Sequence, residues 1–163
     1  MPADRDASVE DPIDADAGGG RRDPAMADAQ AVVDRVERDE IAARIARERL
    51  REGPMIPIIP DATISPLLHA GEQVLAVREA ALLNPPSGDP ALPGYGGALY
   101  LTSERLVHTG RVLVSIALDQ VREVSLAGER LLLTLDGGEG MTLETDRPRL
   151  LRVEISAAQR SLR

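Results

Sequence analysis

The sequence contains no cysteine, phenylalanine, tryptophan or lysine, and only two tyrosines among its 163 residues. Without cysteine, a disulfide framework, a thiolate nucleophile and a zinc–thiolate site are excluded, and a cytoplasmic location is favoured. Without large aromatic residues, the core has to be built from Leu, Val, Ile and Ala, which bury less area each. The absence of lysine beside many Arg, Ala and Gly residues indicates a composition bias of the genome rather than selection of arginine at each site.

Positive charge is in deficit, because 19 basic residues face 27 acidic ones and the formal net charge is −8. This balance argues against nonspecific nucleic-acid binding, which requires cations against the phosphates. No apolar run approaches the ~18 residues of a membrane span, and the N-terminus lacks the basic start and apolar stretch of a secretory signal. We therefore expect a cytoplasmic protein without a transmembrane segment, and any membrane contact to be peripheral.

The length suits one folded domain, which we place at residues 71–163. Residues 1–26 are rich in Asp, Ala, Gly and Pro. They cannot bury enough surface to offset the entropy of ordering, so a disordered acidic arm is predicted. This arm is either a solvated tail or a docking segment.

A helix is predicted over residues 27–53, because this stretch is rich in Ala, Glu and Arg and has neither Gly nor Pro before Gly53. It either lies on the domain or pairs with a partner helix, and we favour the first because strict heptads are few. Residues 54–70 are predicted to be an extended connection, whose early prolines exclude a central strand. Its apolar part, residues 54–60, is expected to cover an open face of the core. The apolar side chains of the helix form one narrow stripe of Val33, Val36, Ile41, Ile45 and Leu50.

Seven runs with β-strand character follow, separated by turn residues at the spacing of an antiparallel meander. They are residues 73–83, 97–102, 105–109, 112–116, 121–127, 130–135 and 141–145. Residues 84–96, rich in Pro and Gly, are predicted to be an exposed loop. Alternation predicts which side chains point inward: Val112, Val114, Ile116, Leu131, Leu133, Leu135, Met141 and Leu143.

The chain ends in a predicted amphipathic helix over residues 146–162. Asp146 is its predicted N-cap, and Pro148 falls in the first turn, where proline is tolerated. The predicted fold class is therefore mainly β (α+β): seven antiparallel strands capped by a C-terminal helix. This helix closes one end of the β structure with a stripe of Leu151, Ile155, Ala158 and Leu162.

Two motifs carry a resemblance to a known family: G-x-L-Y-L-T-x-x-R-L from Gly97 to Leu106, and I-x-L-D-x-V from Ile116 to Val121. With the strands and the final helix, they make residues 71–162 resemble the pleckstrin-homology-like (PH-like) superfamily, in particular bacterial PH-like and GRAM-type domains. The resemblance implies a partly open barrel of two nearly orthogonal sheets, loops that bind lipid headgroups, peptides or partner proteins, and no catalysis. Lipid-binding members carry basic residues in the first strand pair and its loop. Residues 84–96 have none, so the usual phosphoinositide pocket is not expected.

Five arginines are candidate contacts for an anion or a lipid headgroup, because guanidinium groups bind phosphate and carboxylate in a bidentate manner. The alternative is a scattered set of solvated strand residues, most of them beside acids. The candidates are Arg78, Arg105, Arg111, Arg122 and Arg130.

No constellation in the sequence points to a reaction, a cofactor or a metal. His69 and His108 lack neighbouring ligands at metal-binding spacing, and His108 is expected to be a structural residue in its strand. Ser103 and Ser115 have no partner base. Only a deep pocket that gathers His108 with a carboxylate would favour an enzyme.

The sequence therefore predicts a non-catalytic PH-like binding module. It is expected to recruit a protein partner, or weakly a membrane surface carrying anionic lipid. The alternative is a structural protein that oligomerises through the helix at residues 27–53.

Overall fold

The computed structural model describes residues 24–83 and 95–163, so the predicted acidic arm up to residue 23 and residues 84–94 of the predicted loop lie outside it. The helices are α1 (Pro24–Glu52) and α2 (Pro148–Ser161), with short 3-10 turns η1 (Ser65–Leu67) and η2 (Leu118–Gln120). The strands are β1 (Val74–Leu82), β2 (Tyr95–Thr102), β3 (Arg105–Thr109), β4 (Leu113–Ala117), β5 (Val121–Ala127), β6 (Arg130–Leu135) and β7 (Gly140–Thr145).

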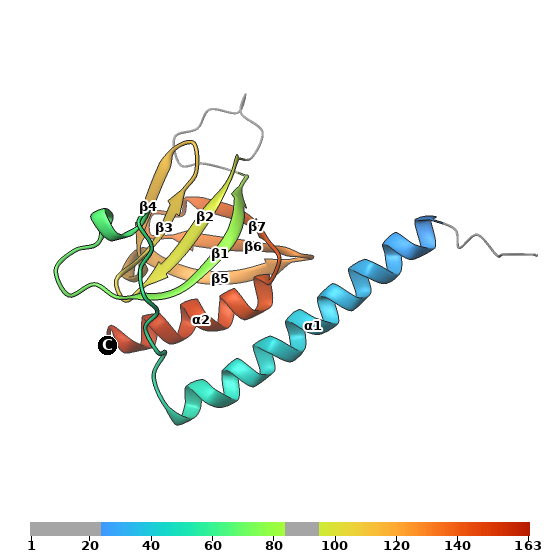
Figure 1. Ribbon diagram of the computed structural model, residues 1–163, viewed down its shortest axis with the longest axis horizontal. Helices are drawn as coiled ribbons and strands as arrows, with labels where there is room; N and C mark the ends of the chain where they lie inside the picture. Colours follow the sequence, from blue (N-terminus) through green and yellow to red (C-terminus); the bar gives the residue numbers. More distant parts are fainter. Residues whose placement is uncertain (1–23, 84–94) are drawn as a thin grey trace, which may run out of the picture.

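All seven strands form one antiparallel sheet in the order β4-β3-β2-β1-β7-β6-β5. β2 pairs along the whole of β1, whereas β7 pairs only with Ala80, Ala81 and Leu82 at its end. The sheet is strongly curved, with α2 against it and α1 beyond α2 (Figure 1). β4 and β5 are the two edges, so the sheet is open. The predicted mainly-β class, with seven antiparallel strands and a C-terminal helix, is confirmed.

The predicted strand boundaries agree with the structure to within two residues. Val112 precedes β4 and is exposed, so its predicted inward orientation is wrong. Val114 is half-buried and Ile116 is buried, as their alternation requires. The predicted inward residues of β6 and β7 are buried, apart from the half-buried Leu135.

The main core lies between the inner face of the sheet and α2, and it consists of aliphatic residues and Met141. From α2 it takes Leu151, Ile155 and Ala158. Leu162 follows the last residue of α2 and is exposed, so its predicted place in the stripe is wrong. Burial of a Leu, Ile or Val side chain stabilises a fold by about 1.5–3 kcal/mol, which lets a core of many such residues dispense with aromatics.

A second, smaller core covers the outer face of β1, β2 and β3. Its buried Ile64 packs against Val74, Tyr100 and Val107, which lie on the opposite face from the main core. The Tyr100 hydroxyl donates a hydrogen bond of 2.7 Å to Asp61. Residues 61–68, predicted to be a connection, are therefore folded onto the sheet. Residues 54–60, predicted to cover an open face of the core, contribute only the partly buried Met55 to it and leave three isoleucines exposed.

α1 packs along α2 (Figure 1), which confirms that this helix lies on the domain. It begins at Pro24, three residues before the prediction, since proline is tolerated at the first helical position. No helix in the described part of the chain is long and apolar enough to span a membrane. The residues on the covered face of α1 are spaced alternately three and four apart: Val36, Asp39, Ala43, Ala46 and Leu50.

Three residues of the predicted apolar stripe of α1 do not lie on its covered face. Val33, Ile41 and Ile45 are 56%, 41% and 57% exposed, so the prediction is wrong for them. The prediction followed the largest apolar side chains, whereas the covered face uses the small residues Ala43 and Ala46, which let the two helices approach.

The N-terminus of α2 is capped by Asp39 of α1. Its Oδ2 accepts a hydrogen bond of 2.8 Å from the N–H of Arg149, and its Oδ1 accepts one of 3.0 Å from the N–H of Leu150. Asp39 is only 2% exposed. The predicted cap by Asp146 is wrong, because Arg147 occupies the N-cap position and makes no side-chain cap. The carboxylate satisfies two free N–H groups and also faces the positive end of the helix dipole.

Candidate functional site

Four of the five predicted arginines are held by acids in separate parts of the sheet. Arg111 precedes β4 and has no ion pair among the residues described. An anion would have to displace a carboxylate at each of the other four, so the structure does not bring these side chains together as one free site. The pairs are Arg78–Glu154 at 2.7 Å, Arg105–Glu72 at 2.9 Å, Arg122–Asp136, and Arg130–Glu144 at 3.3 Å.

The Arg78–Glu154 pair joins β1 to α2. One guanidinium nitrogen of Arg78 donates to both carboxylate oxygens of Glu154, at 2.7 and 2.8 Å. Burial raises the pKa of Glu154, and the charge of Arg78 opposes that rise. The pair therefore anchors the helix to the sheet at some cost in desolvation.

The Arg105–Glu72 pair lies at the start of the sheet and is more completely bonded. Nε and Nη2 of Arg105 donate to Glu72 at 2.9 and 3.0 Å, and the Thr102 hydroxyl donates at 2.6 Å. The N–H of His69 adds a bond of 2.8 Å. Burial raises the pKa of Glu72, but the bonds from Arg105, His69 and Thr102 outweigh it and hold the pKa at about 2, against an ordinary value of 4.5.

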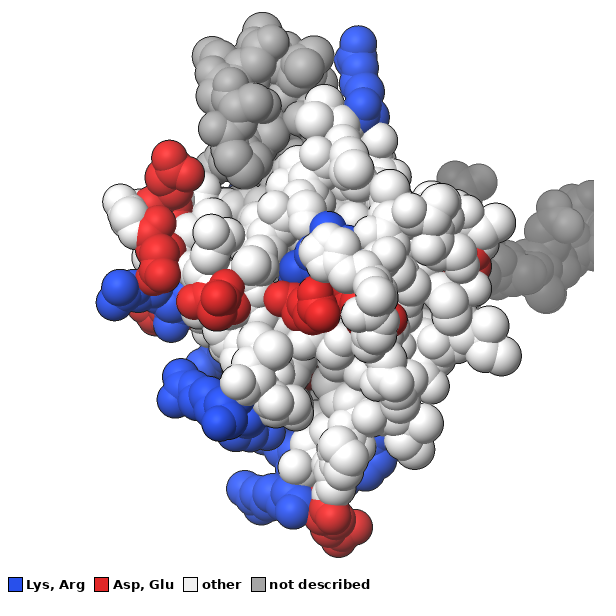
Figure 2. All heavy atoms as spheres, turned by 90° about the vertical axis from the view of Figure 1, so that its left-hand side faces the viewer, with Lys and Arg blue, Asp and Glu red and all other residues white. Residues whose placement is uncertain are grey.

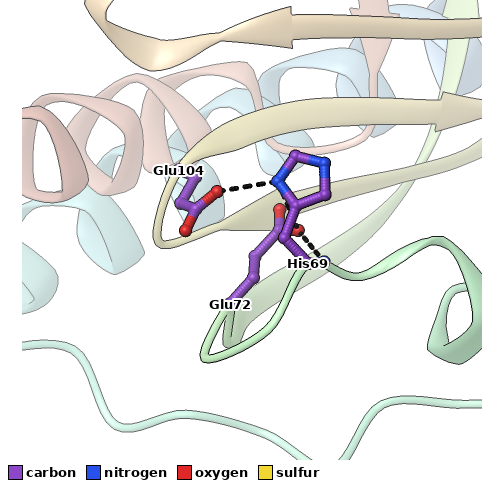
Figure 3. A group of neighbouring side chains, drawn as sticks. All are labelled: His69, Glu72 and Glu104. Carbon is purple, nitrogen blue, oxygen red and sulfur yellow. Dashed lines mark hydrogen bonds and ion pairs between the residues drawn. The ribbon is translucent and has the colours of Figure 1, made fainter.

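His69 and Glu104 stand beside this pair, from the loop before β1 and the turn between β2 and β3 (Figure 3). His69 Nδ1 lies 3.0 Å from Glu104 and 3.8 Å from Glu72. The three ligand atoms fall within 4.8 Å of one another, close enough for a metal ion. Glu72 is already bonded to Arg105, so only His69 and Glu104 are available, fewer than the three or four ligands of typical zinc sites.

The prediction that His69 has no neighbouring ligand is wrong, because the carboxylate of Glu72, three residues later, turns toward its ring. Glu104 could not be found from the sequence, since it lies 35 residues from His69 in the chain. The structure gives the cluster an evident role in tying two loops together. We therefore interpret the cluster first as a structural bracket, meaning a set of contacts that holds these two loops together.

His108 is buried, and its Nε2 lies 3.0 Å from the carbonyl oxygen of Ala80. Its Nδ1 has no hydrogen-bond partner among the described residues, so this structural histidine is satisfied at one ring nitrogen only. The Ser115 hydroxyl accepts a bond from Arg105, and the Ser103 hydroxyl accepts one from the N–H of Gln73. These hydroxyl groups serve as acceptors within the fold.

A groove runs along the seam between α1 and α2, with a volume of about 590 Å³. Its lining contains four arginines and no acid, and none of the four is among the five arginines predicted as anion contacts. A smaller hollow of about 290 Å³ continues it, shares Leu50, Arg51 and Arg160, and is also lined by Glu52. We call this groove the helix seam; its lining residues are Arg47, Leu50, Arg51, Arg152, Val153, Ser156 and Arg160.

A larger hollow, of about 660 Å³, lies beside the ends of β1 and β7. It includes Arg130, but the surrounding charges are of both signs, and Arg130 is paired with Glu144. The acids outnumber the arginines, so this hollow does not resemble an anion site. Its charged lining residues are Arg35, Glu79, Glu129, Arg130, Glu144 and Asp146.

No family model and no curated protein matches this chain. Among solved structures, the fold is similar to the crystal structure of the C-terminal domain of an unknown protein from Leishmania infantum. That similarity has a TM-score of 0.47 and 16% sequence identity, and covers 59% of this chain and 91% of that one.

Proposed function

We propose that this protein is a non-catalytic, PH-like binding module of the cytoplasm that recruits a protein partner through the free edge of β4. The architecture expected from the sequence motifs supports the PH-like assignment: an open antiparallel sheet of seven strands with a helix after the last one. A fold of this type hosts many functions, so the proposal rests on a specific surface.

The observation that carries the proposal is the contrast between the two edge strands. β4, with the sequence L-V-S-I-A, has no charged residue and no proline, and Leu113 is 54% exposed. β5 carries Arg122 and Glu123, with a register shift between Val121 and Glu123. Charges and bulges protect an edge from pairing with another chain. β5 has both devices, whereas β4 has neither.

An unprotected edge suits an extended peptide, which adds to the sheet through main-chain hydrogen bonds. No strand among the described residues pairs with the outer side of β4. The exposed Leu113, and Val112 just before the strand, would supply apolar contacts on opposite faces of such a peptide.

Selection of peptides from a random display library against the full chain tests this proposal. We expect the selected sequences to be free of proline and rich in β-branched residues. Leu113→Lys should weaken their binding by about tenfold or more, because a lysine would place a charge at the open edge. Val77→Lys is the matched control, since Val77 is also 40% exposed but lies in a central strand. Equal loss in both variants, or no selected peptides, would contradict the proposal.

A second candidate function, oligomerisation through α1, is favoured by the exposed residues Val33, Ile41 and Ile45. They lie off the face that packs on α2, and α1 extends well past α2 (Figure 1). The same apolar face of α1 on a second copy of the chain would bury these three residues.

Size-exclusion chromatography with light scattering distinguishes this second candidate. If α1 joins two copies, an Ile41→Gln, Ile45→Gln variant should be monomeric where the unaltered chain is not, and Glu48→Gln should behave like the unaltered chain. A monomeric unaltered chain would exclude this candidate. Deletion of α1 is a poorer experiment, because it would remove the Asp39 cap of α2.

A further inference from the structure

We propose that the helix seam is a binding site for an anion that carries at least two phosphoryl groups. This inference does not depend on the proposed partner site at the β4 edge. It rests on the number of guanidinium groups in one groove, on their lack of acidic partners and on the shape of the groove.

The first observation is the charge of the groove. Arg47 and Arg51 come from α1, and Arg152 and Arg160 come from α2, with no Asp or Glu in the lining. Arginine keeps its charge at all physiological pH values, so the groove holds four positive charges. The whole chain has a net charge of −8, so the charge of this groove is opposite in sign to that of the chain.

The second observation is the lack of partners. Within the described part of the chain, only Arg47 among these four has an ion pair, a half-exposed contact of 3.6 Å with Glu40. Exposed pairs of this kind contribute little to stability, and an anion of higher charge can replace them. The seam arginines therefore differ from Arg78 and Arg105, each of which has a carboxylate in bidentate or multiple contact.

Neutralisation of helix dipoles explains only part of this arrangement. Arg51 and Arg160 lie in the last turns of their helices, where cations are favourable. Arg152 is the fifth residue of α2, far from its C-terminal end, so the dipole gives no reason for a cation there. Arg47 likewise precedes the last turn of α1.

The geometry of the helices brings these charges together. Asp39 meets the start of α2, while Leu50 and Arg51 share a hollow with Ala157 and Arg160, so the helices run side by side in the same direction. Figure 2 shows basic side chains gathered low on the face that carries the ends of the helices, with one acidic side chain beside the lowest of them and the other acidic ones above. Guanidinium groups on both walls can thus donate to one ligand placed between them.

Four guanidinium groups call for a ligand of more than one negative charge, and phosphoryl oxygens match their paired N–H donors. The floor of the groove is apolar at Leu50 and Val153, and Ser156 donates its hydroxyl proton to the carbonyl of Arg152. The charge therefore comes from the walls alone. A soluble phosphorylated compound and a phosphorylated lipid headgroup both present this chemistry.

Calorimetric titration of the full chain with pyrophosphate, at low and at physiological salt, tests the site. We expect binding that weakens as salt rises. An Arg152→Gln, Arg160→Gln variant should bind about tenfold or more weakly, since it loses two charge-assisted contacts. The control is Arg122→Gln, Arg130→Gln, which removes the same charge from exposed residues of the sheet and should bind pyrophosphate as the unaltered chain does.

Sedimentation with vesicles separates the two sources of the ligand. Vesicles of phosphatidylcholine alone and mixed with phosphatidylinositol bisphosphate, whose headgroup carries more than one phosphoryl group, are used with the same three proteins. Retention on the mixed vesicles that is lost in the seam variant identifies a lipid headgroup, whereas pyrophosphate binding without retention identifies a soluble ligand. The proposal is overturned if neither probe binds, or if the sheet control loses as much binding as the seam variant. Leu113→Lys should leave pyrophosphate binding unchanged, so failure of the β4 proposal is distinguishable.

Discussion

The arginines of the sheet and the arginines of the helix seam differ in what surrounds them. On the sheet, Arg78 and Arg105 each hold a largely buried carboxylate, and their side chains join separate elements of the fold. At the seam, Arg51, Arg152 and Arg160 line one groove without an acid. The use of arginine throughout the chain does not explain which arginines lack partners. The difference separates residues that stabilise the fold from residues available to a ligand.

The largest expected effect is the loss of the Glu72 carboxylate. Glu72→Gln should lower the free energy of unfolding by about 3–5 kcal/mol, because it leaves Arg105 without its buried counter-charge. Urea denaturation measures this loss. Glu139→Gln, at an exposed position of the turn between β6 and β7, is the control and should change stability little. If Glu72→Gln were as stable as the control, the pair would not be a bracket of the fold.

Removal of the cap on α2 should have the next largest effect. Asp39→Ala leaves the N–H groups of Arg149 and Leu150 without an acceptor, so we expect a loss of about 2 kcal/mol in the free energy of unfolding. Glu37→Ala, at an exposed position of the same helix, is the matched control. A loss no greater than that of the control would mean that water or another group caps α2 equally well.

The pH dependence of stability should show the sheet pairs directly. Glu72 has its pKa lowered to about 2 from 4.5, so its contribution is present above pH 4.5 and is lost as the pH falls toward 2. Burial raises the pKa of Glu154, so the contribution of Glu154 to the free energy of unfolding has the opposite pH dependence: it decreases as the pH rises above 4.5. The free energy of unfolding, measured by urea denaturation at a series of pH values from 7 to 2, should therefore change less below pH 4.5 in Glu72→Gln than in the unaltered chain. An equal change with pH in both proteins would contradict this assignment.

The smallest expected effect on stability is at the seam. Arg152→Gln should change the free energy of unfolding by no more than about 0.5 kcal/mol, because the exposed side chain has no ion pair in the described part of the chain. Thermal denaturation measures it. A large loss would show that Arg152 stabilises the packing of α1 on α2, and the comparison between sheet and seam would then fail.

Features that depend on neighbouring residues were predictable. The strands of the hairpin from β5 to β6 have the predicted bounds, because alternating apolar residues and the turn at Gly128 are local signals. Pro148 was placed correctly in the first turn of α2 for the same reason. The apolar stripe of α1 was not, since the choice of covered face depended on how closely α2 approaches.

The candidate sites could not be predicted in this way. Asp39 caps a helix that begins more than a hundred residues later, and its position within α1 gave no indication of that role. Glu104 reaches His69 only because the turn between β2 and β3 folds back on the loop before β1. Each contact joins residues that are distant in the chain.

Local patterns were enough to predict a mainly-β chain, seven strands before an amphipathic helix and an aliphatic core, because periodicity and turn chemistry act over a few residues. Which arginines have carboxylate partners, and which line a groove, depends on the packing of the elements. An ion pair requires two charges within about 4 Å, and α1, α2 and the sheet reach that distance only when they pack.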